Sequence, residues 1–111
     1  MARAVIDAGI CGYQTEVVVT SPDGMTVQLA TTSDCPNVQR LMVEMDGQSL
    51  DGWREVMRPR GDAHELSPLQ AAFHEFIPHP GCPVYSGIIK AIEVTLGTAL
   101  PADARIQVVR D

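Results

Sequence analysis

Three cysteines are the residues of this chain best suited to chemistry. Cys11 is followed by a glycine, and Cys35 and Cys82 are each followed by a proline, so every cysteine lies where regular backbone is interrupted. A cysteine that only fills a hydrophobic core needs no such neighbour. An odd number of cysteines spread along a chain also argues against a disulfide framework. We therefore expect reduced thiols or metal ligands, with buried, unreactive thiols as the alternative.

Cys82 lies at the start of the strongest predicted helix. Proline suits the first position of a helix, where a missing N–H costs nothing, so we expect Pro83 to begin the helix and Cys82 to be its N-cap. Ser86, Lys90 and Glu93 form a narrow polar stripe among apolar residues, which predicts a mostly buried helix. Unpaired N–H groups at a helix start favour a thiolate. Cys82 is therefore a candidate site residue.

The other two cysteines have related settings. Cys35 precedes Pro36 at the start of another predicted helix, and Cys11 lies in a glycine-flanked break between strands, where backbone can approach an ion closely. Three thiolates that converge suit a soft metal centre. Their wide spacings are not those of a zinc finger or a ferredoxin, so the local motif alone leaves metal binding open.

A tetrahedral metal ion held by three thiolates needs a fourth ligand. His79 is three residues before Cys82, and Asp34 is adjacent to Cys35. Imidazole is a common neutral ligand of Zn²⁺, whereas a carboxylate or a water molecule is the alternative. We therefore include His79 and Asp34 among the candidate metal ligands.

The hydrophobic pattern predicts an α+β domain. Strongly strand-forming segments alternate with turns, which favours a small antiparallel sheet over βαβ units. The strands are expected near residues 3–8, 13–20, 25–32 and 105–110. Helices are expected to start at Pro36, after a cap at Ser49, at Pro68 and at Pro83, and to pack mainly on one face of the sheet.

Length and charge restrict the function further. With 111 residues and 45% hydrophobic residues, we expect a single globular domain over residues 1–111. The net charge of −6 repels nucleic acid and anionic membrane surfaces. No apolar run reaches the length of a membrane span, and the first residues lack the apolar region of a secretory signal. We therefore expect a cytoplasmic location.

The order of these pieces resembles that of the U-type iron–sulfur scaffold proteins, IscU and the N-terminal domain of NifU. The matching pieces are a Cys-Gly pair at Cys11, a cysteine at Cys35, Gly-Gln-Ser-Leu-Asp at 47–51, and Cys82 followed by Lys-Ala-Ile at 90–92. Scaffold proteins carry an aspartate soon after the first cysteine, where this chain has Tyr13. They also place a histidine directly before the last cysteine.

Two further resemblances involve the same cysteines. Ser-Asp-Cys at 33–35 and Cys-Pro at 82–83 are similar to the TSCPD domain found beside some ribonucleotide reductases. Cys-Gly-Tyr, Ser-Asp-Cys-Pro-Asn-Val and Cys-Pro-Val-x-Ser-Gly-Ile-x-Lys-Ala-Ile-Glu resemble a small prokaryotic family of unknown function. This last pattern covers most of the chain.

These resemblances imply a metal-binding module with an iron–sulfur-scaffold-like fold. An iron–sulfur cluster or Zn²⁺ would be held by Cys11, Cys35 and Cys82, and a sulfur or iron–sulfur donor or acceptor protein would be the partner. A thiol or persulfide carrier, or a thiol-dependent enzyme that uses a helix-start cysteine, is the first alternative. A structural domain with non-ligating cysteines is the second. We identify no catalytic serine or carboxylate pair and no glycine-rich phosphate loop.

Overall fold

The structure, a computed structural model, describes residues 1–57 and 65–111. Strands come first in this part of the chain, and helices dominate its second half, as the sequence pattern predicts. The elements are, in order, β1 (Ala2–Asp7), β2 (Gln14–Thr20), β3 (Thr26–Ser33), α1 (Pro36–Met45), β4 (Leu50–Asp51), α2 (Gly52–Val56), α3 (Pro68–Phe76) and α4 (Val84–Leu96). The predicted α+β class is confirmed.

The strands form one antiparallel sheet in the order β1-β2-β3-β4. Alternate residues of a strand point to opposite faces. Val17, Val19, Val27 and Leu29 therefore share the buried face. The residues between them lie on the other face, where Gln28 is exposed and Val18 is half-buried. The period of two in the sequence thus defines one buried face and one open face.

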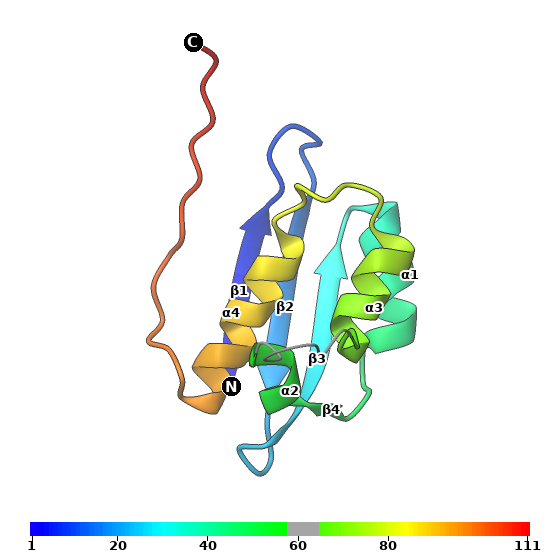
Figure 1. Ribbon diagram of the computed structural model, residues 1–111, viewed down its shortest axis with the longest axis vertical. Helices are drawn as coiled ribbons and strands as arrows, with labels where there is room; N and C mark the ends of the chain where they lie inside the picture. The colour runs from blue at the N-terminus through cyan, green and yellow to red at the C-terminus, as the bar shows by residue number, and fades with distance from the viewer. Residues whose placement is uncertain (58–64) are drawn as a thin grey trace.

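The helices cover only the buried face of the sheet (Figure 1). The helix α4 packs on β1 and β2, and α1 packs on β3. The helices α2 and α3 contact each other and also pack against α4 and α1, respectively. One hydrophobic core lies between these layers, and Leu41, Leu69, Ile88 and Ile92 are among its fully buried residues.

The direction of α4 is fixed by two contacts with the sheet. A Cβ atom at Gly87, near the start of the helix, would lie 2.4 Å from the Cγ1 and Cδ1 atoms of Ile6 near the end of β1. Near the other end of the helix, the Thr95 hydroxyl lies 3.4 Å from the carbonyl oxygen of Val19, and its shorter hydrogen bond, at 2.8 Å, goes to the Ala91 carbonyl within α4. The glycine therefore allows a close approach, and α4 begins beside the end of β1.

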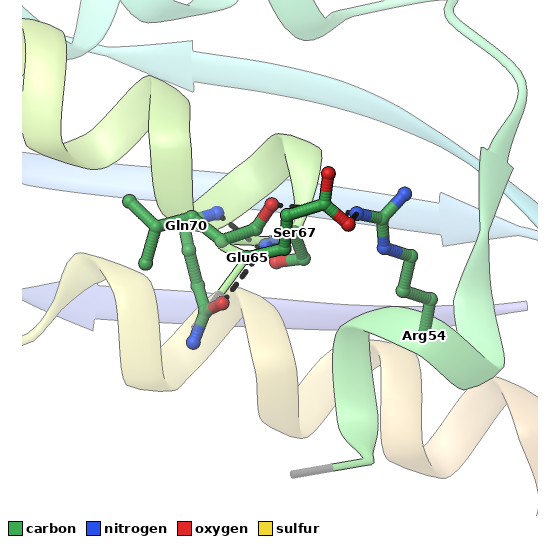
Figure 2. Close-up of polar contacts among 5 residues, drawn as sticks. Arg54, Glu65, Ser67 and Gln70 are labelled. Carbon is green, nitrogen blue, oxygen red and sulfur yellow. Dashed lines mark hydrogen bonds and ion pairs between the residues drawn. The ribbon is translucent and has the colours of Figure 1, made fainter. Parts of the chain in front are cut away.

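The starts of two helices agree with the sequence prediction. Pro36 is the first residue of α1 and Cys35 is its N-cap. At the start of α3, the Ser67 hydroxyl accepts the N–H of Gln70 and the Gln70 side chain accepts the N–H of Ser67, which is a capping box (Figure 2). Arg54 from α2 reaches this region and lies 3.9 Å from Glu65.

The starts of the other two helices differ from the prediction. The N-cap of α4 is Pro83, one residue later than predicted, because its carbonyl accepts the N–H of Gly87 at 3.1 Å. The N-cap of α2 is Asp51 instead of Ser49, and its carboxylate accepts the N–H of Arg54 at 3.3 Å. Leu50 and Asp51 form β4, which pairs with β3.

The predicted strand at 105–110 is wrong. Residues 98–111 contain no helix or strand, and residues 100–111 are all exposed. In Figure 1 this segment leaves α4 and runs past the β1 side of the domain. An alternating pattern forms a strand only when a neighbouring strand satisfies its backbone groups. The fourth strand of the sheet is instead the short β4.

In the described part of the chain, none of the helices combines the length and the hydrophobicity that crossing a bilayer requires.

Candidate functional site

The three cysteines lie on three connections at one end of the domain. These are the loop between β1 and β2 (residues 8–13), the connection from β3 to α1 (34–35) and the loop between α3 and α4 (77–83). Figure 1 shows all three at the end opposite the β2–β3 turn. We call these three segments the cysteine end. Antiparallel pairing accounts for the first two, since β1 and β3 both finish where β2 starts.

Cys11 occupies the tip of the first connection. The hairpin is closed by the N–H of Ala8, which donates to the carbonyl of Tyr13 at 3.1 Å. Inside it, the N–H of Gly12 donates to the carbonyl of Gly9 at 2.9 Å, and both glycines have positive φ. This tight turn exposes the side chain of Cys11, so its thiol is open to reagents and partners.

Cys35 is held by a network of side chains under the second connection. The hydroxyl oxygens of Thr15 and Ser33 are 2.7 Å apart and buried. The Ser33 hydroxyl also accepts the N–H of Cys35 at 3.1 Å, and the Ser33 carbonyl accepts the Gln39 side-chain amide at 2.8 Å. Cys35 is half-buried against the core and its thiol makes no capping hydrogen bond.

Asp34, the neighbour of Cys35, is tied through its backbone. Its N–H donates to the carbonyl of Gln14 at 3.3 Å, which extends the β2–β3 pairing by one step. Its side chain is exposed. The position of Asp34 is therefore defined, while its carboxylate remains in solvent.

Cys82 lies in a turn directly before α4. Its N–H donates to the carbonyl of His79 at 3.1 Å, and its side chain is half-buried against the core. Across the same loop, the rings of Phe73 in α3 and Tyr85 in α4 meet edge to face with 5.0 Å between their centroids. This aromatic contact joins the two helices whose connection carries Cys82. The side chain of His79 is exposed.

The side chains at the cysteine end do not form a ready metal site. Within residues 1–57 and 65–111, no three or more histidine, cysteine, aspartate or glutamate side chains are grouped so that they could hold one metal ion. The three cysteines are free thiols. The fold thus brings together the segments that carry Cys11, Cys35 and Cys82, whereas a shared ligand geometry stays a prediction, as do His79 and Asp34 as ligands.

Sequence reasoning missed the residues that position Cys35. Thr15 and Ser33 occupy buried positions in strands whose other inward residues are mainly valine and leucine. A polar residue on the apolar face of a strand predicts a buried hydrogen bond, because an unpaired hydroxyl there is costly. That signal was present in the alternation of β2 and β3. The partner of each hydroxyl, however, depends on the register of the two strands.

Comparison with known proteins gives one family and no described function. Searches among curated proteins and among solved structures find no match to this chain. The model of a family of unknown function, DUF6951, matches residues 2–108. That match covers nearly the whole chain, including all three cysteine-bearing connections. The chain therefore belongs to DUF6951, a family of unknown function.

Proposed function

We propose that the cysteine end binds a metal centre, either an iron–sulfur cluster or Zn²⁺, through Cys11, Cys35 and Cys82. One observation carries this proposal. Residues that are far apart in the sequence lie on three connections at the same end of the sheet (Figure 1). The order of the cysteines and of the segments between them also resembles that of U-type iron–sulfur scaffold proteins. Thiolates are suitable ligands for both kinds of centre.

Binding would require the side chains to rearrange. No preformed group exists among the described residues, so the thiols must turn toward one another and lose their protons. Metal binding is commonly coupled to such ordering and to proton release. Cys35 and Cys82 have fixed backbones, and Cys11 is on an exposed hairpin tip. The largest change is therefore expected in the loop 8–13.

The proposal includes a partner and a compartment. A metal site at one exposed end of a small domain suits exchange with a sulfur or iron–sulfur donor or acceptor protein. Free thiols persist in the reducing environment of the cytoplasm, where we place the protein. The formal charge of −6 disfavours nucleic acid as an alternative partner.

A second candidate is a thiol or persulfide carrier, and the setting of Cys35 favours it. Cys35 is the N-cap of the ten-residue helix α1, and its thiol makes no capping bond. The start of a helix carries unpaired N–H groups, which favour a negative charge placed beside them. In this case one cysteine thiolate would attack the outer sulfur of a donor protein's persulfide, which forms a new S–S bond and releases the donor as a thiol. The other two cysteines would be dispensable.

The two candidates are separated by purification without oxygen. A module that holds an iron–sulfur cluster is expected to contain iron and acid-labile sulfide and to absorb visible light, whereas a zinc module contains zinc and does not absorb visible light. In either case, each of the variants Cys11→Ser, Cys35→Ser and Cys82→Ser should lose the metal. Ser49→Ala, an exposed change outside the cysteine end, is the control. Full metal retention in all three cysteine variants contradicts the metal proposal. A protein that carries no metal and gains the mass of one sulfur atom on a single cysteine supports the carrier.

A further inference from the structure

The two edge strands of the sheet differ in how their outward backbone groups are hydrogen-bonded. On the outer side of β3, beyond the short pairing with β4, the Leu29 carbonyl accepts the N–H of Gly47 at 3.2 Å. The N–H of Thr31 donates to the carboxylate of Asp46 at 2.8 Å, and the Ser33 carbonyl accepts the side-chain amide of Gln39. At each of Leu29, Thr31 and Ser33, one outward backbone group of β3 is therefore hydrogen-bonded within the chain.

The outer edge of β1 has no such cover among the described residues. β1 pairs only with β2 in the described chain. Backbone bonds in an antiparallel pair alternate, and the N–H of Ala8 donates to Tyr13 across this hairpin. The even residues of β1 therefore bond to β2, and the N–H and C=O groups of Arg3, Val5 and Asp7 point outward. An open edge strand is a template for pairing with another chain.

The residues along this edge are complementary to themselves. We propose that two copies of this chain pair through antiparallel β1 strands about a two-fold axis at Val5. This register places Val5 opposite Val5 of the second copy, and Arg3 opposite its Asp7 at both ends. In each of these pairs, the backbone N–H and C=O groups of both residues point toward the other copy, so each pair forms two backbone hydrogen bonds. The two sheets then continue into one another.

Charge selects this register over its neighbours. If the register shifts to the next hydrogen-bonded pairing in one direction, Arg3 lies opposite Val5 of the second copy and Asp7 has no charged partner. If it shifts in the other direction, Asp7 lies opposite Val5 and Arg3 has no charged partner. Parallel pairing in register places like charges together, which is unfavourable across strands. The proposed register therefore combines the largest number of backbone bonds with opposite charges at both ends.

The side chains concerned are accessible in the single chain. They lie on the open face of the sheet, where Val5 is 54% exposed. Arg3 lies 3.7 Å from Glu16, and Asp7 accepts a bond from the side chain of Gln14 at 3.0 Å. These are exposed contacts that cost little to rearrange.

The pairing is independent of the proposed metal site. A two-fold axis through β1 places the two α4 helices on the same side of the joined sheet and the two cysteine ends at opposite ends of it. No thiol takes part, so the dimer must persist in a reducing agent. Because a single strand pair buries less area than a standard interface, the association should depend on protein concentration.

The C-terminal segment is the competing occupant of this edge. Ile106, Val108 and Val109 are 69–87% exposed, and the segment runs past the β1 side of the domain (Figure 1). Its charges are spaced differently from those of β1, because Arg105 and Arg110 directly flank its apolar residues, and Asp103 and Asp111 lie outside these arginines. The experiment below therefore includes variants of both segments.

Sedimentation equilibrium of the full chain in reductant tests the proposal. The wild type should show a monomer–dimer equilibrium. Arg3→Asp and Asp7→Arg should each weaken it by at least about tenfold, because like charges then face each other at both ends of the strand pair. The double variant Arg3→Asp with Asp7→Arg restores opposite charges and should restore the dimer. Rescue by the double variant separates a charge contact from a folding defect, which circular dichroism also monitors.

Controls are the matched charge change Arg105→Asp and the double change Ile106→Asp with Val108→Asp in the C-terminal segment, both of which should leave the dimer intact. A wild-type chain that stays monomeric up to about 1 mM, the weak end of specific association, overturns the proposal. So does a dimer that ignores the β1 variants. Loss of dimer only in the C-terminal variants assigns the edge to that segment instead.

Discussion

The hydroxyl groups of Thr15 and Ser33 form a buried hydrogen bond of 2.7 Å between β2 and β3, next to the point where the chain turns into α1. The same Ser33 oxygen accepts the N–H of Cys35. Buried hydroxyls must be paired because their desolvation is otherwise uncompensated. One cross-strand contact therefore stabilises the sheet and also positions the backbone of a candidate metal ligand.

Ser33→Ala should destabilise the domain by about 1–3 kcal/mol, because it leaves the Thr15 hydroxyl buried without its partner. It should also speed the chemical modification of the Cys35 thiol, since the Cys35 N–H loses its acceptor. Urea unfolding and mass spectrometry of alkylated protein measure the two effects. Thr32→Ala, on the exposed face of the same strand, is the control. Equal modification rates in both variants would remove Ser33 from the site.

The contact between Gly87 and Ile6 gives a second prediction. Gly87→Ala should destabilise the domain by about 1–3 kcal/mol, because the new Cβ would lie 2.4 Å from side-chain atoms of Ile6. The loss should appear in urea unfolding as a lower midpoint. Gly81→Ala is the control, because Gly81 has no atom within 4 Å of a Cβ and its φ is not positive.

A double-mutant cycle separates this contact from a general loss of helix packing. Ile6→Ala removes the atoms that the new Cβ would meet, so Gly87→Ala should cost less in the Ile6→Ala background than in the wild type. An additive cycle would show that the two residues are energetically independent, and the close approach would then have another cause.

Local chemistry explains the parts of the fold that could be predicted from the sequence. The turn at residues 21–24, the start of α1 at Pro36 and the cap of α3 at Ser67 depend on residues within one turn of chain, and the structure has all three. The alternation of apolar and polar residues in 14–20 and 26–33 predicts that these segments are β-strands. The caps of α2 and α4 are just as local, yet they lie one or two residues later than predicted, so local chemistry predicted that these helices exist but did not fix where they start.

The rest depends on contacts between distant residues. The segment 105–110 alternates as well as β1 does, yet it has no partner strand in the described chain. The strand β4 has only two residues and forms because the chain after α1 returns along β3. The sequence indicated which residues could ligate a metal, and the fold places their segments at one end of the domain. The directions of the side chains at that end depend on tertiary contacts, so a sequence pattern does not predict them.

The β2–β3 turn gives a prediction about pH. The carboxylate of Asp23 accepts the N–H of Met25, then the N–H and the hydroxyl of Thr26, at 2.9, 2.8 and 2.9 Å. These bonds, in that order of importance, lower the pKa of Asp23 below its usual 3.8. A lowered folded-state pKa gives a stabilisation that is present above the unfolded-state pKa and is lost as pH falls through the folded-state value.

Asp23→Asn should therefore lose stability at neutral pH, and the difference from the wild type should shrink as the pH falls below 3.8, the usual pKa of the carboxyl. Urea unfolding at a series of pH values measures this difference. Asp103→Asn, in the exposed C-terminal segment, is the control for a general effect of charge. A difference that stays constant across the acid range would contradict the role of the Asp23 carboxylate.

The last prediction concerns the fourth ligand of the proposed metal centre. His79 is three residues before Cys82, and its carbonyl accepts the Cys82 N–H, so the two residues share one turn. Asp34 is adjacent to Cys35, and its backbone is tied to Gln14. Both side chains are exposed, so either is free to turn toward a metal ion, and the His79 imidazole is the better ligand for Zn²⁺ bound by three thiolates.

If His79 is the ligand, His79→Ala should lower the Zn²⁺ affinity at neutral pH by about tenfold or more, and Asp34→Ala should leave it unchanged. The affinity should also fall as the pH drops, because protons compete for the imidazole and the thiolates. Competition with a chelator of known affinity measures both effects, and His74→Ala, an exposed histidine on α3, is the control. Loss of affinity in the aspartate variant alone would transfer the role to Asp34. Unchanged affinity in both variants would leave water as the fourth ligand, since water can complete a site held by three protein ligands.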